Sequence, residues 1–273
     1  MITFILITND PQVAEYAERC GVGRIFVDLE VIGKQQRQGH LDTLMSRHSM
    51  DDIAKVKAKL TCADLLVRLN PMHSGTEAEI EAAIIGGAEL LMLPMFRTAD
   101  EVREFCKLVR GRAKVVPLVE TYEGAMALSE IVNINGVTEI YIGLNDLHLD
   151  MKLSFMFEPL ANGFVDKLVA IIKASGKPFG FGGIARYGEG LIPGEMVLGE
   201  HFRLGSSSVI LSRTFHRKSE NLQDFLESID LSQELSKLNS AGVNLIARSS
   251  KNIEADYYKL SSVVENLISE KKK

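Results

Sequence analysis

Residues 114–120 read KVVPLVE, an almost continuous apolar run that ends in a single carboxylate, Glu120. A run without alternation of apolar and polar residues is typical of a strand covered on both faces, as in a parallel sheet. Seven other runs of this kind occur along the chain, and segments with helical patterns separate them. In chain order the eight runs are FILIT, RIFVDLE, DLLVRLN, ELLMLPM, KVVPLVE, EIYIGLND, KPFGFGG and SVILS.

The runs in the middle of the chain end at a constant spacing. Each of the following ends lies 26 residues from the next: Arg68, Pro94, Glu120 and Asp146. This spacing suits one strand, one helix and two short loops, and a capping box at residues 98–101 marks the start of one such helix. Eight strand–helix units of this size predict a (β/α)₈ TIM barrel. A doubly wound open sheet has the same alternation and stays the alternative.

The composition is that of a soluble globular protein that acts on small molecules. Of the 273 residues, 46% are hydrophobic and 25% are charged, which is ordinary for a folded domain. The net charge of −5 argues against a general nucleic-acid binder, because such proteins need a basic surface. No apolar run approaches the roughly 20 residues that cross a membrane, and no secretory signal is evident. Three scattered cysteines indicate neither a disulfide framework nor a zinc site, so we expect a cytoplasmic protein.

Polar residues close several of the expected strands. These are Asp28 and Glu30 in the second run, Arg68 and Asn70 in the third, Glu120 in the fifth, and Asn145 and Asp146 in the sixth. In a TIM barrel the carboxyl ends of the strands meet at one face, where the active site lies. The acids can hold a hard divalent cation, and the arginine can bind a carboxylate. Each residue alone could instead cap a helix or pair with an arginine, but the set indicates a metal enzyme acting on an organic acid.

Four motifs around these strand ends occur in a distinctive order. They are LVRLNP at 66–71, LMLPM at 91–95, VPLVET at 116–121 and GVTEIYIGLNDLHLDM at 136–151. In order and spacing they resemble the HpcH/HpaI aldolase and citrate lyase β-subunit family, with similarity over residues 24–215. The resemblance implies a TIM barrel of the pyruvate and phosphoenolpyruvate superfamily, with a divalent metal held by Glu120 and Asp146. It also implies that Arg68 binds the carboxylate of pyruvate and stabilises an enolate oxygen.

The enolate chemistry implied by this resemblance accounts for the residue types. Breaking or forming the bond beside the methyl group of pyruvate requires an enolate, whose negative oxygen a divalent ion and a fixed guanidinium stabilise. Two carboxylates with open positions favour Mg²⁺, with Mn²⁺ or Co²⁺ as alternatives, whereas zinc sites favour His and Cys. Because the expected strand ends carry no obvious lysine, a Schiff-base aldolase is the weaker mechanism.

The second run departs from both branches of the family that it resembles. Aldolases read Asp-x-Glu-His there and citrate lyases read Asp-Leu-Glu-Asp, but residues 28–31 of this chain are Asp-Leu-Glu-Val. Citrate lyases usually carry a lysine after the fourth-strand proline, where this chain has Met95. The sequence therefore lies between the branches, and Val31 replaces the residue that serves as a base in the aldolases.

The proton-transfer group has to come from other residues. We expect Asp28 and Glu30 to face the metal site, with Glu30 as the better candidate for acid–base work. His40 and His48 lie in the following loop and have a suitable pKa, so either could replace the missing base. The alternative for each histidine is a helix cap or a solvent-exposed position.

Several basic or polar residues could bind the rest of the substrate. Lys34 and Arg37 lie in KQQR after the second run, and Arg186 lies in the glycine-rich segment 179–190 after the seventh. Loops after the last two strands of a barrel commonly bind phosphate. We expect these three residues and Asn70 to contact the substrate, although KQQR is also typical of a solvated loop and glycine clusters also mark tight turns.

The barrel should be complete by residue 215, so we expect a catalytic domain at 1–215 and additional helices at 216–273. SENLQDFLESIDLSQELSKL and NIEADYYKLSSVVENLISEKKK have apolar residues at helical spacing, and NSAGVNLIARSS separates them. These helices cover either the barrel or a neighbouring subunit. The family resemblance favours a homo-oligomer that shares them.

Two classes of function stay open. The first is a metal-dependent carbon–carbon lyase that joins or releases pyruvate and an aldehyde through an enolate, and a citrate-lyase-like enzyme acting on acyl-CoA is a close variant. The second is a non-catalytic binder of pyruvate or another oxo acid that has lost its base. Metal affinity without turnover would identify this binder.

Overall fold

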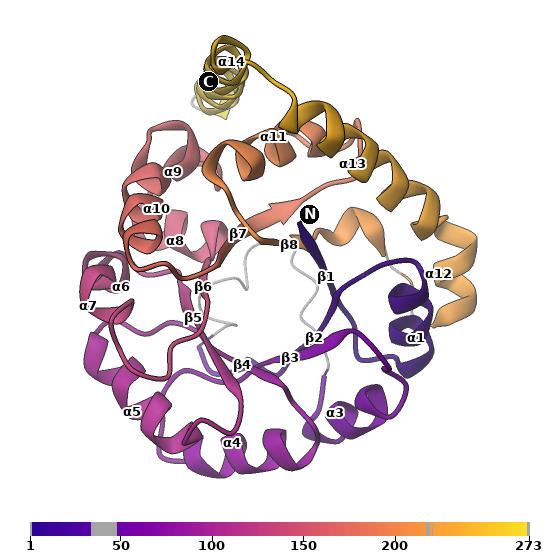
Figure 1. Ribbon diagram of the computed structural model, residues 1–273, viewed down its shortest axis with the longest axis vertical. Coiled ribbons are helices and arrows are strands. Elements are labelled where there is room, and N and C mark those ends of the chain that lie inside the picture. The colour runs from indigo at the N-terminus through magenta and orange to yellow at the C-terminus, as the bar shows by residue number, and fades with distance from the viewer. Residues whose placement is uncertain (1, 34–47, 217–218, 220, 272–273) are drawn as a thin grey trace.

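The computed structural model describes residues 2–33, 48–216, 219 and 221–271. Eight parallel strands close into a barrel in sequence order, and the last strand pairs with the first (Figure 1). The predicted TIM barrel is confirmed, and the open sheet is excluded. The strands are β1 (Thr3–Ile7), β2 (Arg24–Asp28), β3 (Asp64–Arg68), β4 (Leu90–Leu93), β5 (Lys114–Val119), β6 (Ile140–Ile142), β7 (Phe179–Ile184) and β8 (Ser208–Leu211).

Helices surround the barrel and cover the outer faces of its strands (Figure 1). The capping box predicted at residues 98–101 is present, because the Glu101 carboxylate accepts a hydrogen bond from the Thr98 backbone N–H (2.9 Å) at the start of α5. The elements are α1 (Pro11–Arg19), α3 (Met50–Lys57), α4 (Thr76–Ile85), α5 (Ala99–Val109), α6 (Tyr122–Met126), α7 (Leu128–Ile131), α8 (Leu144–Asp150), α9 (Glu158–Ala161), α10 (Phe164–Ala174), α11 (Gly194–Leu204), η1 (Arg213–Phe215), α12 (Leu222–Ser228), α13 (Leu231–Ile246) and α14 (Ser250–Lys271).

Apolar side chains fill the interior of the barrel, including Phe26, Met92 and Tyr141. Near the amino ends of the strands, Arg24 makes a buried two-point ion pair with Glu139, with N···O distances of 3.1 and 3.0 Å. Ser208 also donates to the Glu139 carboxylate (2.9 Å), so three hydrogen bonds hold this buried carboxylate. The packed interior and this ion pair close the amino end and leave the carboxyl end for a cavity.

The barrel is irregular between β7 and β8. The register of the two strands shifts between Gly180 and Gly183. Across the gap, the Tyr141 hydroxyl donates to the Gly182 carbonyl (2.8 Å) and accepts from the Ile210 N–H (2.9 Å). Gly182 has φ +50°, in the left-handed region that favours glycine. A side chain from β6 therefore replaces part of the backbone ladder, and Gly182 and Gly183 leave β7 without side chains just before its last residue, Ile184.

Two sequence predictions about element ends were wrong. The sixth strand ends at Ile142, and Asn145 and Asp146 lie in the first turn of α8 instead of in the strand. The segment at 239–246, predicted as a linker, is helical and belongs to α13. Its Gly242 contacts Phe202 of α11 so closely that a Cβ there would lie 3.0 Å from the ring, so this glycine serves helix packing and not a chain break.

The C-terminal helices pack on the barrel helices. Phe225 of α12 contacts Tyr16 of α1 edge-on, with 6.1 Å between ring centroids. Contacts also join α13 and α14 to α11, and Figure 1 shows α14 outside the ring of barrel helices. The first predicted C-terminal helix is divided in two, since Asp230 caps α13 by accepting a hydrogen bond from the Gln233 N–H (2.9 Å). The boundary at residue 215 and the shared-helix oligomer stay predictions.

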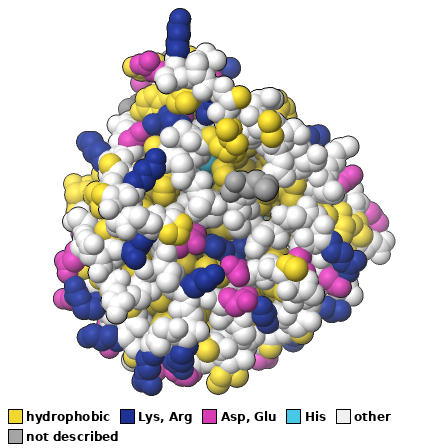
Figure 2. Space-filling view, viewed as in Figure 1, with side chains coloured by type: hydrophobic (Ala, Val, Ile, Leu, Met, Phe, Trp, Pro, Cys, Tyr) yellow, Lys and Arg dark blue, Asp and Glu magenta, His cyan; other side chains and the backbone are white. Residues whose placement is uncertain are grey.

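Acidic and basic side chains are mixed on the surface. On the face shown in Figure 2, Lys and Arg side chains are interspersed with Asp and Glu. Ion pairs such as Lys57–Glu89 (2.8 Å) link such residues. In the described part of the chain, no helix has the length and hydropathy needed to span a membrane.

Candidate active site

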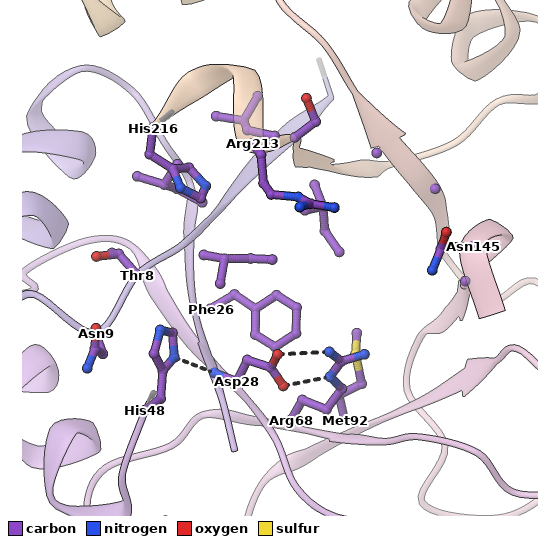
Figure 3. Close-up of a pocket in the computed structure, with 18 of the residues that line it drawn as sticks. Thr8, Asn9, Phe26, Asp28, His48, Arg68, Met92, Asn145, Arg213 and His216 are labelled. Carbon is purple, nitrogen blue, oxygen red and sulfur yellow. Dashed lines mark hydrogen bonds and ion pairs between the residues drawn. The ribbon is translucent and has the colours of Figure 1, made fainter. Parts of the chain in front are cut away.

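A cavity of about 500 Å³ lies at the carboxyl ends of the strands. Side chains from strand ends and from the loops after them line it, as Figure 3 shows. The structure brings five of the predicted site residues together in this lining: Asp28, His48, Arg68, Glu120 and Asp146.

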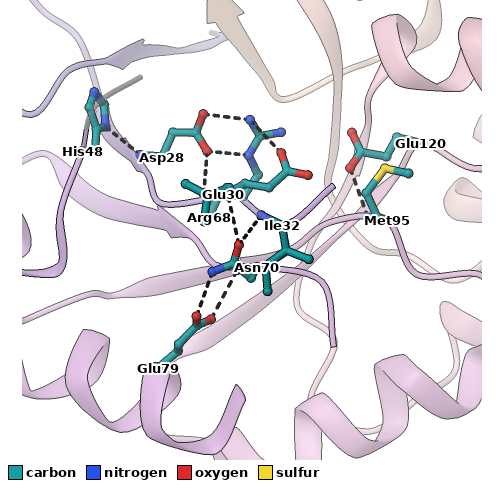
Figure 4. Close-up of polar contacts among 10 residues, drawn as sticks. Asp28, Glu30, Ile32, His48, Arg68, Asn70, Glu79, Met95 and Glu120 are labelled. Carbon is teal, nitrogen blue, oxygen red and sulfur yellow. Dashed lines mark hydrogen bonds and ion pairs between the residues drawn. The ribbon is translucent and has the colours of Figure 1, made fainter. Parts of the chain in front are cut away.

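Arg68 lies in this lining at the end of β3 and is held by two carboxylates from the end of β2. Its Nε and Nη2 donate to the two oxygens of Asp28 at 2.8 and 2.9 Å. Nη2 also lies 3.3 Å from Glu30 Oε2 (Figure 4). The pairing follows from the register, because Asp28 and Arg68 are direct neighbours across β2 and β3. Asp28 and Glu30 therefore orient the guanidinium, and Glu30 itself lies outside the cavity lining.

The environment keeps Arg68 charged. Burial acts to lower its pKa, but the Asp28 and Glu30 carboxylates outweigh burial and hold the pKa well above the ordinary value. The guanidinium also lies over the Phe26 ring, 5.6 Å from the ring centroid. Within the described residues, Nη1 donates no hydrogen bond to the protein. Arg68 thus offers a fixed positive charge with one nitrogen available for an anion.

Glu120, directly after β5, and Asp146, in the first turn of α8, form the acidic part of the cavity. Burial, repulsion by Asp146 and repulsion by Glu30 together raise the pKa of Glu120 well above its ordinary value. A hydrogen bond from the Met95 N–H to Glu120 Oε1 (3.0 Å) and the charge of Arg68 oppose this rise. A cation bound between the two side chains would offset this repulsion and favour the ionised carboxylate of Glu120.

The backbone around Glu120 is shaped to hold its carboxylate in place. Met95 has φ +54°, an unusual conformation for a side chain of this type, and its N–H donates to Glu120. Gly143 lies on the other side, where an added Cβ would come 2.9 Å from Glu120 Oε2. Thr121 then caps α6 by accepting from the Gly124 N–H (3.1 Å) and donates to the Phe96 carbonyl (2.6 Å). The Glu-Thr motif therefore places a carboxylate and fixes the turn behind it.

This donor set fits a hard divalent cation. Mg²⁺ is commonly bound by one or two protein carboxylates, with water and substrate oxygens completing an octahedron. Glu120 and Asp146 supply two such ligands in one cavity. In the described part of the chain, no group of three or more His, Cys, Asp or Glu side chains is arranged to hold a metal by itself. The arrangement thus suits a cation whose remaining positions are filled by substrate and water.

His48 lies at the edge of the same cavity. Its Nδ1 accepts a hydrogen bond from the Asp28 backbone N–H (2.9 Å), as Figures 3 and 4 show. A neutral imidazole that accepts at Nδ1 carries its proton on Nε2. In this tautomer His48 is a hydrogen-bond donor and not a base.

Two predicted substrate-binding residues do not line the cavity. Asn70 accepts hydrogen bonds from the N–H groups of Val31 and Ile32, both at 2.9 Å, and donates to Glu79 (2.7 Å), so it anchors the chain after β2. Arg186 pairs with Glu189 at 2.6 Å behind β7. Both therefore have local partners outside the cavity. The predicted Lys34, Arg37 and His40 lie outside the described residues.

Sequence reasoning missed the part of the lining that follows β1, β7 and β8. This part includes Asn9, Gly182, Gly183, Arg213 and His216. Arg213 and Asn9 each come shortly after a predicted strand, so the rule that identified Arg68 and Glu120 would also have found them. The glycines had been read as a possible phosphate loop, but the structure shows them in the strand itself.

A family model for HpcH/HpaI aldolase/citrate lyase matches residues 6–159, more than half of the chain. This chain belongs to the HpcH/HpaI aldolase/citrate lyase family. The matched part runs from the end of β1 through β6 and therefore contains Arg68, Glu120 and Asp146. It ends in α9, before β7, β8 and the C-terminal helices. No curated protein matches the sequence.

Solved structures of low sequence identity share the fold of this family member. A HpcH/HpaI aldolase/citrate lyase family protein from Burkholderia cenocepacia J2315 is 15% identical, with a TM-score of 0.61 over 87% of this chain and 95% of that one. CitE from Mycobacterium tuberculosis, in complex with magnesium, acetoacetate and coenzyme A, is 16% identical, with a TM-score of 0.60 over 97% and 88%. Citrate synthase SbnG is 15% identical, with a TM-score of 0.58 over 88% and 94%.

Proposed function

We propose that this protein is a divalent-metal-dependent carbon–carbon lyase that forms or cleaves a 2-oxo acid through the enolate of pyruvate. The observation that carries this proposal is the convergence of Arg68, Glu120 and Asp146 on one cavity. Family membership supports lyase or aldolase chemistry in general. The cavity residues support the narrower choice of a pyruvate-type enolate, because they combine a carboxylate binder with a cation site.

Glu120 and Asp146 would hold the cation, with Mg²⁺ preferred and Mn²⁺ or Co²⁺ as alternatives. A cation bound there supplies Lewis-acid stabilisation of the negative charge on the enolate. The Met95 N–H holds the Glu120 carboxylate, and the first turn of α8 presents Asp146, so little reorganisation is needed when the ligand enters.

Arg68 would bind the pyruvate carboxylate and stabilise the enolate oxygen. Asp28 uses Nε and Nη2 of the guanidinium, and Nη1 is then directed at the substrate. Because Asp28 locks the plane of the guanidinium, the charge is positioned before the substrate arrives. Asp28 therefore acts through Arg68 and is a positioning residue.

The structure changes the role that we assign to His48. Because its Nδ1 accepts the Asp28 N–H, we assign His48 to holding the chain at the end of β2 and not to removing a proton. Val31, at the position of the aldolase base, is 64% exposed, and its N–H is bound to Asn70. His40 stays a candidate base, outside the described residues.

A lyase of acyl-CoA substrates is the second candidate. The M. tuberculosis CitE structure contains acetoacetate and coenzyme A, which favours such substrates for part of the family. Here Met95 replaces the lysine that the citrate lyase resemblance calls for, and its backbone N–H serves Glu120. This difference favours free pyruvate over an acyl-CoA.

Exchange of the pyruvate methyl protons with D₂O, followed by NMR, tests the proposal without knowledge of the aldehyde. With Mg²⁺, Mn²⁺ or Co²⁺ we expect exchange that EDTA abolishes. Glu120→Gln should reduce it at least about 100-fold, because one oxygen ligand and its charge are lost. Gln still accepts the Met95 N–H, so the fold should survive.

Glu123→Gln is the matched control. Glu123 lies three residues further on, is exposed on α6 and pairs with Arg97 away from the cavity. This variant should exchange like the parent protein. Exchange that persists in Glu120→Gln, or that ignores EDTA, contradicts the proposal. Absence of exchange with every metal points to the acyl-CoA lyase or to the non-catalytic binder.

A further inference from the structure

One acidic residue of the motif at 136–151 lies beside the cavity without lining it. Asp150 is the last residue of α8, one helical turn after Asp146. Its carboxylate accepts a hydrogen bond from the Tyr122 N–H at the start of α6 (2.7 Å). It also accepts one from Arg97 Nη2, in the segment after β4 (2.9 Å). Asp150 therefore joins the three segments that follow β4, β5 and β6, which are neighbours in the barrel.

Each of these segments carries a group of the proposed cation site. After β4, Met95 lies two residues before Arg97, and its N–H holds the Glu120 carboxylate. After β5, Glu120 itself lies two residues before the N–H group that donates to Asp150. In α8, Asp146 and Asp150 share one short helix. Asp150 thus connects, from outside the cavity, the segments that present the cation ligands.

The hydrogen bonds of Asp150 are of a strong kind. Both donors meet a charged carboxylate, and one donor is a charged guanidinium. The Asp150 side chain is 18% exposed, so solvent screens these contacts only in part. Arg97 also pairs with Glu123 (2.5 Å), but that side chain is 56% exposed, and exposed ion pairs contribute little to stability. The connection is therefore made by Asp150 and not by Glu123.

Such a connection matters because the two proposed cation ligands repel each other. Burial and repulsion by Asp146 raise the pKa of Glu120 well above its ordinary value. If the two carboxylates were free to separate, a cation would have to draw them together, at a cost in affinity. Contacts outside a metal site that orient its ligands commonly change metal affinity by about 10- to 100-fold. Asp150 is placed to make such a contact, since it fixes the start of α6 to the end of α8.

We propose that Asp150 is a positioning residue for the divalent cation, and that with Arg97 it holds Glu120 and Asp146 at a separation that suits Mg²⁺. Asp150 contacts neither the cation nor the substrate and acts through the two ligands. The inference rests on the proposed function and extends its cation site to residues outside the cavity. A fixed separation selects by size, because Mg²⁺ takes oxygen ligands at about 2.1 Å and Ca²⁺ at about 2.3–2.6 Å. Asp150 should therefore determine the preference for Mg²⁺ over Ca²⁺.

Calorimetric titration with Mg²⁺ and with Ca²⁺, in the presence of pyruvate, tests this role without an activity assay. Asp150→Ala should raise the Kd for Mg²⁺ about 10-fold and the Kd for Ca²⁺ less than about threefold. Loss of the carboxylate charge alone would weaken both ions equally, since both are divalent. Asp150→Asn removes the same charge but can still accept the Tyr122 N–H, so it should recover part of the Mg²⁺ preference.

Asp166→Ala is the matched control. Asp166 is a half-buried carboxylate of α10 that pairs with Arg203 and lies outside the cavity lining. This variant therefore also breaks an arginine–carboxylate pair, but one that joins no segment of the cation site. It should bind both ions like the parent protein.

Binding by Glu120→Gln separates failure of this inference from failure of the proposed function. If the parent protein binds Mg²⁺ more tightly than Glu120→Gln does, the cation site stands. Unchanged Mg²⁺ affinity in Asp150→Ala, or an equal loss for the two ions, then overturns the positioning role. If the parent protein binds no divalent ion, or if Glu120→Gln binds equally well, the proposed cation site fails and this inference fails with it.

Discussion

The two sides of the cavity hold their buried polar groups in opposite ways. On the enolate side, formed by the ends of β2, β3, β5 and β6, the groups are charged and set against one another, as Asp28 is with Arg68. On the acceptor side, the name used here for the wall formed by β7 and β8, two contacts join neutral groups. There Tyr141 bridges the two strands, and the His201 ring stacks on Phe181 with 3.8 Å between centroids.

We expect the charged side of the cavity to carry the chemistry and the side formed by β7 and β8 to determine specificity. Opposed charges in a dry site give a rigid electrostatic field, which an enolate needs whatever its partner. The glycines of β7 shape the space beside them without adding such a field. The family model covers the end of β1 through β6, with Arg68, Glu120 and Asp146, and it ends before β7.

The largest effect should come from removing the charge on the enolate side. Arg68→Met leaves Asp28 and Glu30 buried without their cation, which should destabilise the protein by about 3–5 kcal/mol. Pyruvate exchange should fall by about 100- to 1,000-fold in whatever folded protein remains. Urea unfolding and the NMR exchange assay measure the two losses.

Arg68→Lys is the companion variant. It keeps the charge, so most of the stability should return, but it cannot bind Asp28 through two parallel hydrogen bonds and should recover exchange only in part. Full exchange in folded Arg68→Met would contradict this interpretation, because proton exchange would then not need the ion pairs of Arg68 with Asp28 and Glu30.

The next largest effect should be a pH dependence of the free energy of unfolding that comes from His201, which lies behind β7. Burial lowers the pKa of His201 to about 3, and its Nδ1 and the Ser206 hydroxyl share a hydrogen bond (2.9 Å). Below pH about 6.5 the unfolded chain binds a proton that the folded protein refuses, so stability falls as the pH falls towards 3. The full loss from this one ring is on the order of 4 kcal/mol.

His201→Gln removes this titration. Between pH 6 and 4 its free energy of unfolding should change less steeply than that of the parent protein, by up to about 1.4 kcal/mol per pH unit. Urea titrations at several pH values give the slopes. Equal slopes for the two proteins would show that His201 is not held neutral.

The fold could be predicted because barrels repeat one pattern. The eight apolar runs and the constant spacing of Arg68, Glu120 and Asp146 indicate parallel strands with their carboxyl ends on one face. The ends of elements were less predictable. Glu120 follows its strand directly, but β6 stops at Ile142 and α8 begins two residues later, so a helix turn presents Asp146. Hydrophobic pattern alone does not distinguish a short strand from the first turn of a helix.

The site residues that could be predicted are those whose charged side chains directly follow an apolar run, such as Arg68 and Glu120. Asn70 shares that signal but is used to anchor Val31 and Ile32, a role that depends on how the chain leaves β2. Arg186 likewise meets Glu189 through a local turn. The space beside Gly182 arises from the register shift between β7 and β8. No pattern of residues predicts such a shift, so the shape of the acceptor side could be learned only from the structure.

The smallest effect should come from Tyr141, the residue that maintains this shift. Burial raises the pKa of Tyr141, so the phenol stays protonated and donates to the Gly182 carbonyl. Tyr141→Phe would leave that carbonyl and the Ile210 N–H without their partner, at a cost of about 1–3 kcal/mol. Tyr122→Phe, at an exposed tyrosine, should change stability by less than about 0.5 kcal/mol.

Tyr141→Phe also tests whether the two sides of the cavity act independently. Because the bridge supports β7 and β8, its loss should raise the KM for the aldehyde several-fold and change pyruvate exchange by less than about twofold. The enolate side has its own hydrogen bonds and does not depend on Tyr141. If exchange and aldehyde KM deteriorate together, the barrel couples the two sides, and specificity could not then be altered at β7 and β8 without disturbing the enolate chemistry.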